Sequence, residues 1–267
     1  MNQGNVSLKP YFIDIHTHIL PGLDDGSQDG ETSLQMAEIA AGNGTKCLVC
    51  TKHTDMTEPV SREDGRLIRE GVRWLREELQ RERIPLQVLP GMEIMASEDI
   101  RWKIREELLF GLNDSRYFLV EFPFDAPEDY ISFILDEIHT FDGLVPVIAH
   151  PERYYCVQER PERIYQWVME GCLTQCNRAS LEGKFGGREE ITAQRLMDAN
   201  LVTCIASDAH SSRQRTPRLE GGYRQIASRY GEWTADLLLR GHPERMIRNE
   251  PLEVRGYARP VAPFSME

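Results

Sequence analysis

Apolar and polar residues follow two alternating patterns along this chain, from residue 11 almost to the end. Short runs of β-branched and apolar residues are typical of buried strands, and the longer stretches between them carry apolar residues at helical spacing. The runs predict strands at Tyr11–His18, Lys46–Thr51, Leu86–Pro90, Tyr117–Glu121, Val145–His150, Cys172–Gln175 and Val202–Ser207. The remaining stretches predict helices at residues 30–42, 61–83, 97–109, 127–141, 160–170, 188–199, 217–229, 231–240 and 243–248.

This order of elements predicts the fold. Strands that are each followed by a helix favour a parallel sheet with right-handed crossovers. Closing such a sheet into a barrel buries both of its edges, so we expect a seven-stranded β/α barrel rather than an open doubly wound sheet. The length suits one domain, and we predict an N-terminal extension over residues 1–10, a barrel over residues 11–250 and a C-terminal tail over residues 251–267.

The composition narrows the classes of partner. A formal net charge of -12 would repel a nucleic-acid backbone, so we expect no nucleic-acid partner. Small phosphate esters stay open as substrates, because bound divalent cations can reverse the local potential. The sequence has neither the run of about 20 apolar residues that a membrane span needs nor an N-terminal signal-peptide pattern, which predicts a cytoplasmic protein that is not integral to a membrane.

The cysteines suggest structural rather than chemical roles. Six of them lie at positions 47, 50, 156, 172, 176 and 204, several in apolar runs. In a cytoplasmic protein we expect buried, reduced thiols rather than disulfides. Cys47 and Cys50 have the spacing of a zinc or redox pair, but a strand would point these positions to opposite faces, so that spacing is a weak sign of such a site.

Side chains that can bind metal ions lie where predicted strands end. Five histidines and three carboxylates share this position: His16, His18, His53, Glu93, Glu121, His150, Asp208 and His210. Glu93 is expected just beyond its strand. Because the C-terminal ends of barrel strands converge on one face, six of the seven strand ends would deliver a ligand to one small region.

The mixture of ligands indicates the chemistry. Imidazoles with carboxylates suit Zn, Mn or Fe, and this number of ligands suits two or three ions better than one. Several bound cations can generate hydroxide near neutral pH and stabilise a phosphoryl transfer. Asp14 would share a strand face with His16 and His18, and we expect it to orient an imidazole or to bond a loop rather than to bind an ion.

Two arginines follow the same logic. Arg153 lies three residues after His150, and Arg215 lies five residues after His210. A guanidinium group binds phosphate oxygens in a bidentate manner, so arginines beside a metal cluster are natural substrate ligands. The alternative is a surface salt bridge for each.

The motifs that hold these residues are similar, in order and spacing, to the PHP family of metal-dependent phosphoesterases; they are DIHTHILPGLDDGS, PGMEI, VEFPF, IAHPER and ASDAH. They resemble in particular its bacterial protein-tyrosine phosphatases of capsule and exopolysaccharide systems, from about residue 11 to residue 250. The resemblance implies a distorted seven-stranded, TIM-like β/α barrel and manganese-dependent activity, with Zn, Fe, Co or Mg as alternatives.

The resemblance also implies a substrate and residue roles. The substrate would be phosphotyrosine on the tail of a bacterial tyrosine autokinase that regulates polysaccharide export. Matched position by position, the eight residues above would be the metal ligands, with Glu93 as the bridge between ions, and Arg153 and Arg215 would bind phosphate. Homo-oligomers are known among the proteins it resembles, so self-association is expected to be open to this chain.

One departure from the family pattern changes the expectation. After the second strand the family usually has Thr-Pro-His-His, whereas this chain has Thr51, Lys52, His53 and Thr54. His53 keeps the ligand, but the second histidine is lost. Lys52 could add a cation near the phosphate, or it could be a solvated loop lysine.

Other functions stay open at this point. The barrel could act on a small phosphomonoester, cleave a C–N bond as amidohydrolases do, or bind phosphotyrosine with little turnover. Cys172 and Arg178 have the Cys-x5-Arg spacing of thiol-based tyrosine phosphatases, although the segment between them lacks the glycines of a phosphate-binding loop.

Overall fold

The computed structural model describes residues 10–55 and 58–261 of the protein. Residues 1–9 of the predicted N-terminal extension lie outside this part, as do residues 262–267 of the predicted tail. The division into extension, barrel and tail stays a prediction. Among the described residues, no helix is both long enough and apolar enough to cross a membrane.

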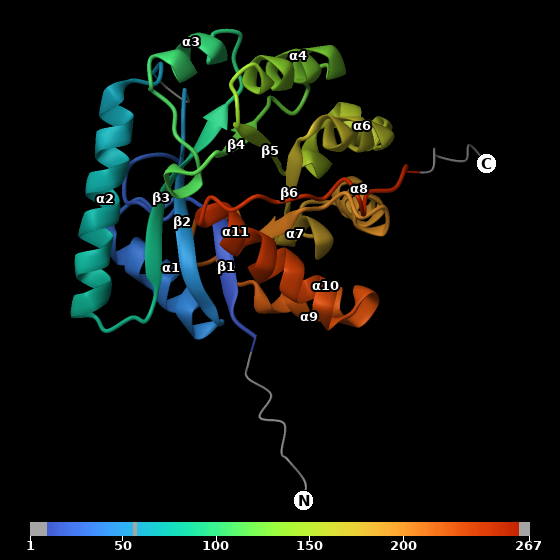
Figure 1. Cartoon of the computed structure of the whole chain (residues 1–267). Coiled ribbons are helices and arrows are strands. Elements are labelled where there is room, and N and C mark those ends of the chain that lie inside the picture. The colour runs from blue at the N-terminus through green and yellow to red at the C-terminus, as the bar shows by residue number, and fades with distance from the viewer. Residues whose placement is uncertain (1–9, 56–57, 262–267) are drawn as a thin grey trace, which may run out of the picture.

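Parallel strands form one sheet whose order follows the chain from β1 to β7 (Figure 1). The strands are β1 Phe12–Thr17, β2 Thr45–His53, β3 Gln87–Met95, β4 Tyr117–Glu121, β5 Val145–Ala149, β6 Leu173–Asn177 and β7 Cys204–Ala206. The two edges meet where Thr17 forms a parallel bridge with Ala209, and the His18 N–H donates to the Ala209 carbonyl at 2.9 Å. The predicted seven-stranded barrel is confirmed, and it is nearly closed.

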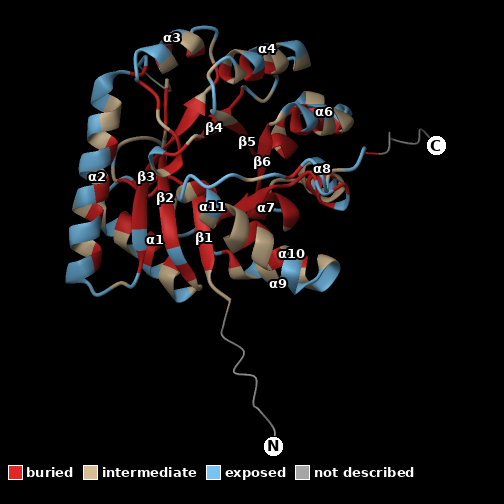
Figure 2. Cartoon of the chain, in the orientation of Figure 1, coloured by how far each residue is buried: buried red, intermediate tan, exposed pale blue. Residues whose placement is uncertain are grey.

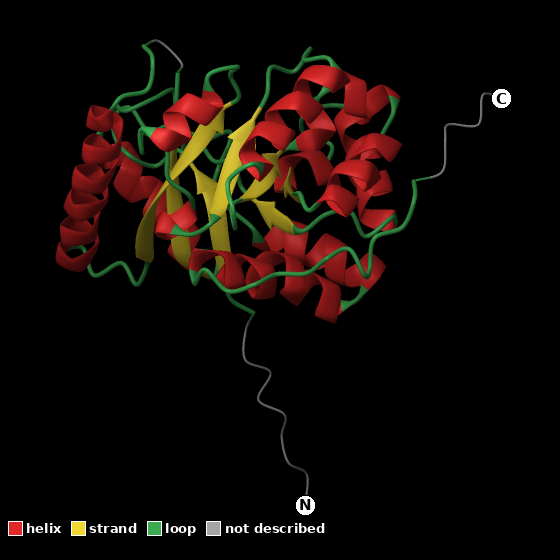
Figure 3. Cartoon of the chain, turned by 45° about the horizontal axis from the view of Figure 1, so that its top comes forward, coloured by secondary structure: helices red, strands yellow, loops and turns green. Residues whose placement is uncertain are grey.

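Helices surround the strands (Figure 3), and their outward faces are the exposed ones (Figure 2). In α2, for example, the buried residues are Ile68, Val72, Leu75 and Leu79, which recur at helical spacing. The α-helices are α1 Gly30–Gly42, α2 Arg62–Arg81, α3 Ile100–Arg105, α4 Glu128–His139, α5 Tyr155–Glu159, α6 Glu162–Glu170, α7 Arg178–Leu181, α8 Gly187–Asp198, α9 Glu220–Tyr230, α10 Glu232–Asp236 and α11 His242–Ile247. Short turns are η1 Leu112–Asp114, η2 Pro151–Arg153 and η3 Leu237–Gly241, the last a π-helical turn.

Some element boundaries differ from the prediction. β3 continues through Pro90 and Gly91 to Met95. At Gly91 it lies so close to β2 that a Cβ there would be 2.6 Å from a methyl group of Val49. The glycine therefore permits close strand pairing here rather than ending the strand. The helix expected at residues 97–109 is shorter, since Glu107 has a positive φ of 55°. Helices α5 and α7 were not predicted.

β1 contains a bulge that affects the side chains it presents. Asp14 pairs with Leu48 and Thr17 pairs with Cys50, so β1 has one more residue than β2 between these pairs. A bulge interrupts the alternation of strand faces and is common beside functional sites. Strict alternation from Asp14 to His18 therefore does not hold in this strand.

Candidate metal centre

All eight predicted metal-binding side chains lie together at the carboxyl end of the barrel. Their relative exposures are 9% or less. Every strand except β6 supplies at least one of them: His16 in β1 and His18 after it, His53 in β2, Glu93 in β3, Glu121 in β4, His150 after β5, and Asp208 and His210 after β7. Glu93 lies within its strand rather than beyond it, because β3 is longer than expected.

Glu93 lies at the centre of this group. Its Oε2 is 2.8 Å from Nε2 of His16, 3.1 Å from Nε2 of His18 and 3.1 Å from Nδ1 of His53. Its Oε1 is 3.0 Å from Nε2 of His150. One carboxylate therefore contacts four imidazoles that come from three parts of the chain, the ends of β1, β2 and β5.

The two oxygens of Asp208 face different neighbours. Oδ1 lies 3.4 Å from Nε2 of His16 and 3.5 Å from Nε2 of His18. Oδ2 lies 2.5 Å from a terminal nitrogen of Arg215 and 3.7 Å from one of Arg153. Asp208 thus joins the histidine cluster to both arginines.

Left-handed backbone marks two of the site residues. His150 has φ of 31° and Asp208 has φ of 50°, a region that non-glycine residues rarely adopt. Such conformations cost about 1–3 kcal/mol each and cluster at functional sites. Here they occur directly after β5 and after β7, where the chain turns at the barrel mouth.

The cluster contains three groups of potential ligand atoms, and within each group all of these atoms lie within 4.8 Å of one another. The groups are His18, Asp25, His53 and His210; His16, His18, Glu93 and Asp208; and His53, Glu93 and Glu121. The groups share members, as expected for a site that binds more than one ion. Asp25 was missed from the sequence, although two adjacent carboxylates close behind a His-x-His motif were the available signal.

The donor atoms fit divalent cations. His53 Nδ1 and Glu121 Oε2 are 3.1 Å apart, yet within the described residues neither atom has a hydrogen-bond partner. Two buried ligand atoms that lie so close without a hydrogen bond are suited to bind the same cation. Imidazole and carboxylate ligands together suit Zn, Mn or Fe. The residues present therefore fit a multi-metal centre.

Burial and charge act against each other in this cluster. Burial disfavours the charged form of His16, but the carboxylates of Glu93 and Asp208 outweigh it and raise the pKa of His16 to about 9. Burial also tends to raise the pKa of Glu93, yet His16 and His53 hold that pKa well below its usual range. The site therefore favours positive charge between ionised carboxylates, which is the charge that a divalent cation brings.

Asp14 has one of the two roles expected for it, because it bonds the loop that follows β7. Its Oδ1 accepts a hydrogen bond from the Ser207 N–H at 3.0 Å and so joins β1 to the end of β7. His18 is held instead by Asp24, whose Oδ2 is 2.9 Å from Nδ1. Asp14 therefore bonds the loop after β7, and Asp24 is the carboxylate that orients an imidazole.

Aromatic rings hold one of the two arginines. The Arg153 guanidinium carbon lies 4.3 Å from the ring centre of Phe124 and 4.9 Å from that of Phe185. Phe185 also lies 5.8 Å from the guanidinium carbon of Arg215. Both arginines are thus beside the cluster, rather than in surface salt bridges remote from it. Neither ring was predicted as part of the site.

The residues that depart from the family pattern have structural partners. Lys52 Nζ donates to Asp64 Oδ1 at 2.9 Å and to the His53 carbonyl at 2.9 Å. Thr54 is buried, and its hydroxyl oxygen accepts a hydrogen bond from the Met95 N–H at 3.0 Å. Lys52 therefore links the end of β2 to the first turn of α2.

The thiol-based alternative does not fit the geometry. Cys172 directly precedes β6 and Arg178 directly follows it, so the five residues of the strand separate them. The six residue steps from one to the other span about 20 Å at about 3.3 Å per residue, too far for both to contact one phosphate. Burial also raises the pKa of the Cys172 thiol well above its usual range. All six cysteines are free thiols, as predicted.

We therefore expect Cys172→Ser to leave kcat/KM for a phosphotyrosine peptide within about twofold of the unchanged protein, because no reacting group is altered. Steady-state phosphate release measures this, with thermal unfolding as a check on folding. A loss of turnover in a variant that melts normally would restore the thiol mechanism.

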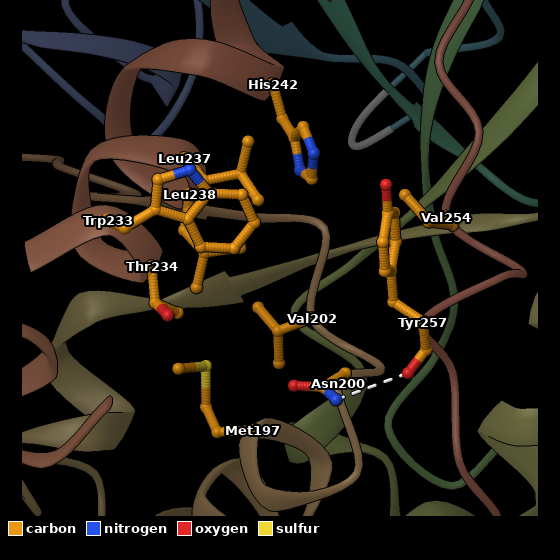
Figure 4. Close-up of a pocket in the computed structure, with 10 residues that line it drawn as sticks. All are labelled: Met197, Asn200, Val202, Trp233, Thr234, Leu237, Leu238, His242, Val254 and Tyr257. Atoms are coloured by element: carbon orange, nitrogen blue, oxygen red, sulfur yellow. Dashed lines mark hydrogen bonds between the residues drawn. The ribbon is translucent and has the colours of Figure 1, made fainter. Parts of the chain in front are cut away.

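A second hollow lies away from this cluster. It has a volume of about 140 Å³ and is lined by residues that include Val202, Trp233, Leu237 and Tyr257 (Figure 4). Val202 precedes β7, whereas the predicted metal-binding residues lie in the C-terminal halves of the strands or after them. The hollow is thus at the opposite end of the barrel from the candidate metal centre.

Comparison with known proteins identifies a family and several relatives that match most of this chain. A family model described as capsular polysaccharide synthesis, CpsB/CapC, matches residues 12–248. Tyrosine-protein phosphatase YwqE of Bacillus subtilis (strain 168) is 34% identical over 240 residues, which cover 90% of this chain and 93% of that protein. Tyrosine-protein phosphatase CpsB of Streptococcus pneumoniae is 30% identical over 243 residues, which cover 89% of this chain and 99% of that protein.

Solved structures agree with this. Crystal structures of YwqE from Bacillus subtilis and CpsB from Streptococcus pneumoniae, described as unique metal-dependent tyrosine phosphatases, include a chain that matches with a TM-score of 0.86 and 33% identity, covering 94% of this chain and 99% of that one. Dihydropyrimidinase from Brevibacillus agri matches with a TM-score of 0.54 at 12% identity, covering 96% of this chain and 73% of that one. The second likeness supports the barrel fold alone.

Proposed function

The chain belongs to the CpsB/CapC family of capsular polysaccharide synthesis, and on that premise we propose that it is a metal-dependent phosphatase that hydrolyses phosphotyrosine. The observation that carries this proposal is the single cluster around Glu93, with two arginines held beside it through Asp208. The family's tyrosine phosphatases YwqE and CpsB match most of this chain.

We assign the metal-binding role to the eight predicted residues and add Asp25. When bound, divalent ions would activate a water molecule as the nucleophile and neutralise charge on the phosphoryl oxygens. His16, His18 and Asp208 would hold one ion with Glu93, and His53 and Glu121 would share Glu93 for a second. Asp25 and His210 would complete a third group with His18 and His53.

The arginines would bind the phosphoryl group. Guanidinium nitrogens can bind two phosphate oxygens at once, and both arginines point such nitrogens at Asp208 Oδ2 beside the cluster. Phe124 and Phe185 pack near the Arg153 guanidinium and limit its orientations, so its nitrogen edges are left for the substrate. The phenolate of tyrosine is a fairly good leaving group, which lessens the need for a general acid where the family has a second histidine.

The finer parts of the proposal concern the metal, the partner and the compartment. Manganese is the metal we propose, and Zn, Fe, Co or Mg are the alternatives for the same ligands. The partner would be the phosphotyrosine-bearing tail of a bacterial tyrosine kinase of capsule synthesis, encountered in the cytoplasm. The capsule family and the phosphatase relatives support this assignment.

A metal titration tests the proposed activity. Protein stripped of metal should release no phosphate from a phosphotyrosine peptide, and Mn, Zn, Fe, Co or Mg should restore turnover to different extents. His16→Ala is the control, because it removes one ligand next to Glu93. Turnover by the metal-stripped protein without added metal, or turnover retained in His16→Ala, would contradict metal-dependent catalysis at this site.

The same titration with other substrates separates the alternatives. Faster release of phosphate from small phosphomonoesters than from the peptide would indicate a small-molecule phosphatase. Tight peptide binding without turnover at saturating Mn would indicate a phosphotyrosine-binding regulator. The departures Lys52 and Thr54 give the second alternative little support, because both side chains are engaged by neighbouring elements.

A further inference from the structure

β6 is the strand that contributes none of the eight ligands, yet two of its amide side chains point into the site. Gln175 and Asn177 are two positions apart, share one face of the strand and are completely buried. Buried amides require hydrogen-bond partners, so the groups they contact are informative.

The two amides form a chain of hydrogen bonds between a histidine and a carboxylate. Gln175 Oε1 lies 2.8 Å from His16 Nδ1. Gln175 Nε2 donates to Asn177 Oδ1 at 2.8 Å, and Asn177 Nδ2 donates to Asp208 Oδ2 at 2.7 Å. The chain therefore runs from His16 through both amides to Asp208.

The direction of every bond in this chain follows from its end. An ionised carboxylate can only accept, so Asn177 must present its amide nitrogen to Asp208 and its oxygen to Gln175. Gln175 must then present its nitrogen to Asn177 and its oxygen to His16. Nδ1 of His16 consequently carries hydrogen, and Nε2 is left as the atom that faces Glu93 and His18.

A buried glutamate fixes the strand end that carries this chain. Glu152 Oε1 accepts hydrogen bonds from the Asn177 backbone N–H at 2.9 Å and from the Ser180 hydroxyl at 2.7 Å. Glu152 itself is fully buried. The position of Asn177 is thus determined by its backbone as well as by its side chain.

We propose that Gln175 and Asn177 are an amide relay that sets the tautomer of His16 and couples it to the position of Asp208. They are positioning residues: they touch the metal-binding side chains and leave His16 Nε2 free for an ion. Because Asp208 Oδ2 also contacts Arg215, the relay connects the metal-binding half of the site to its phosphate-binding half. The inference rests on the metal binding proposed above and does not depend on which phosphoester is hydrolysed.

Metal affinity tests the relay. Gln175→Met and Asn177→Leu keep approximate shape and remove the hydrogen bonds, and each should weaken Mn binding about 10-fold to 100-fold, the usual effect of losing a partner behind a metal-bound histidine. Competition with a fluorescent chelator measures the affinity of metal-stripped protein. Gln87→Met is the matched control, since Gln87 is an exposed glutamine at the start of β3, and it should bind Mn as the unchanged protein does.

A double variant distinguishes a relay from two separate packing effects. If the two amides act as one chain, Gln175→Met with Asn177→Leu should lose little more affinity than the more affected single variant. Losses that multiply would overturn the coupling, and Mn affinity unchanged in a folded Gln175→Met would overturn the proposal.

An NMR measurement tests the proposal even if the variants bind Mn more weakly only because they fold poorly. Long-range proton–nitrogen NMR of Zn-loaded, histidine-labelled protein should show His16 bearing hydrogen on Nδ1, with the signal assigned by its absence in His16→Ala. A His16 ring with hydrogen on Nε2 would contradict the relay directly. Protein that binds Mn and shows this tautomer but releases no phosphate would count against the proposed activity alone.

Discussion

Glu93→Gln is expected to lower kcat/KM for a phosphotyrosine peptide by roughly 10³-fold or more, equivalent to about 4 kcal/mol of transition-state stabilisation. Glu93 contacts His16, His18, His53 and His150, so the change removes charge from the point that two of the ligand groups share. An amide keeps the shape of the side chain, but its neutral oxygen is a weaker metal ligand than a carboxylate oxygen, and its nitrogen cannot bind a cation. The bound metal per chain should fall in parallel.

Two measurements on the same preparation check this result. Phosphate release gives kcat/KM, and elemental analysis after dialysis gives the bound metal. Glu98→Gln is the matched control, because Glu98 is an exposed carboxylate shortly after the same strand. Full metal content in Glu93→Gln would remove Glu93 from the centre of the site.

Arg215→Ala is expected to lower kcat/KM by about 10²-fold, since a guanidinium group that binds phosphate oxygens is lost. Arg215→Lys should recover only part of this loss, because an ammonium group lacks the planar pair of donors. Bound metal should be nearly unchanged, because the Asp208 oxygen that faces His16 and His18 is not the one that contacts Arg215.

A loss of kcat/KM with unchanged bound metal is specific to a residue that binds the phosphoryl group. Steady-state kinetics should show the loss for phosphotyrosine peptide and for phenyl phosphate alike, since both carry the same phosphoryl group. Arg213→Ala serves as the control, because Arg213 is exposed in the same loop. Equal losses in Arg213→Ala, or metal loss in Arg215→Ala, would assign Arg215 a structural role instead.

The strand ends and their chemistry could be predicted because each carries a strong local signal. Glu121 and His150 follow short apolar runs with clear limits, and the structure has β4 at the predicted residues. The convergence of these ends needs only the parallel order of the strands. Glu93 was placed beyond its strand for one physical reason: Pro90 and Gly91 are typical of a strand end, but here they pair closely with β2.

The parts that could not be predicted depend on contacts distant in sequence. Asp25 is half-exposed in a loop and meets His210 through the closure of the barrel. Gln175 and Asn177 have no metal-binding chemistry of their own, so nothing in their local sequence distinguishes them from ordinary strand amides. The bulge in β1 after Asp14 is a further feature that hydrophobic patterning does not record.

The seam between β1 and β7 has a consequence for how this enzyme is made. His18 donates its N–H to Ala209, and Asp208 donates its N–H to the His16 carbonyl at 2.9 Å, so the first and last strands share one wall of the site. A ribosome releases the N-terminal histidines long before Asp208 and His210, because chains are synthesised from the N-terminus. The two proposed ligand groups that contain Asp208 or His210 therefore stay incomplete until the seventh strand emerges, and we expect metal uptake at these two groups to be a late step of synthesis.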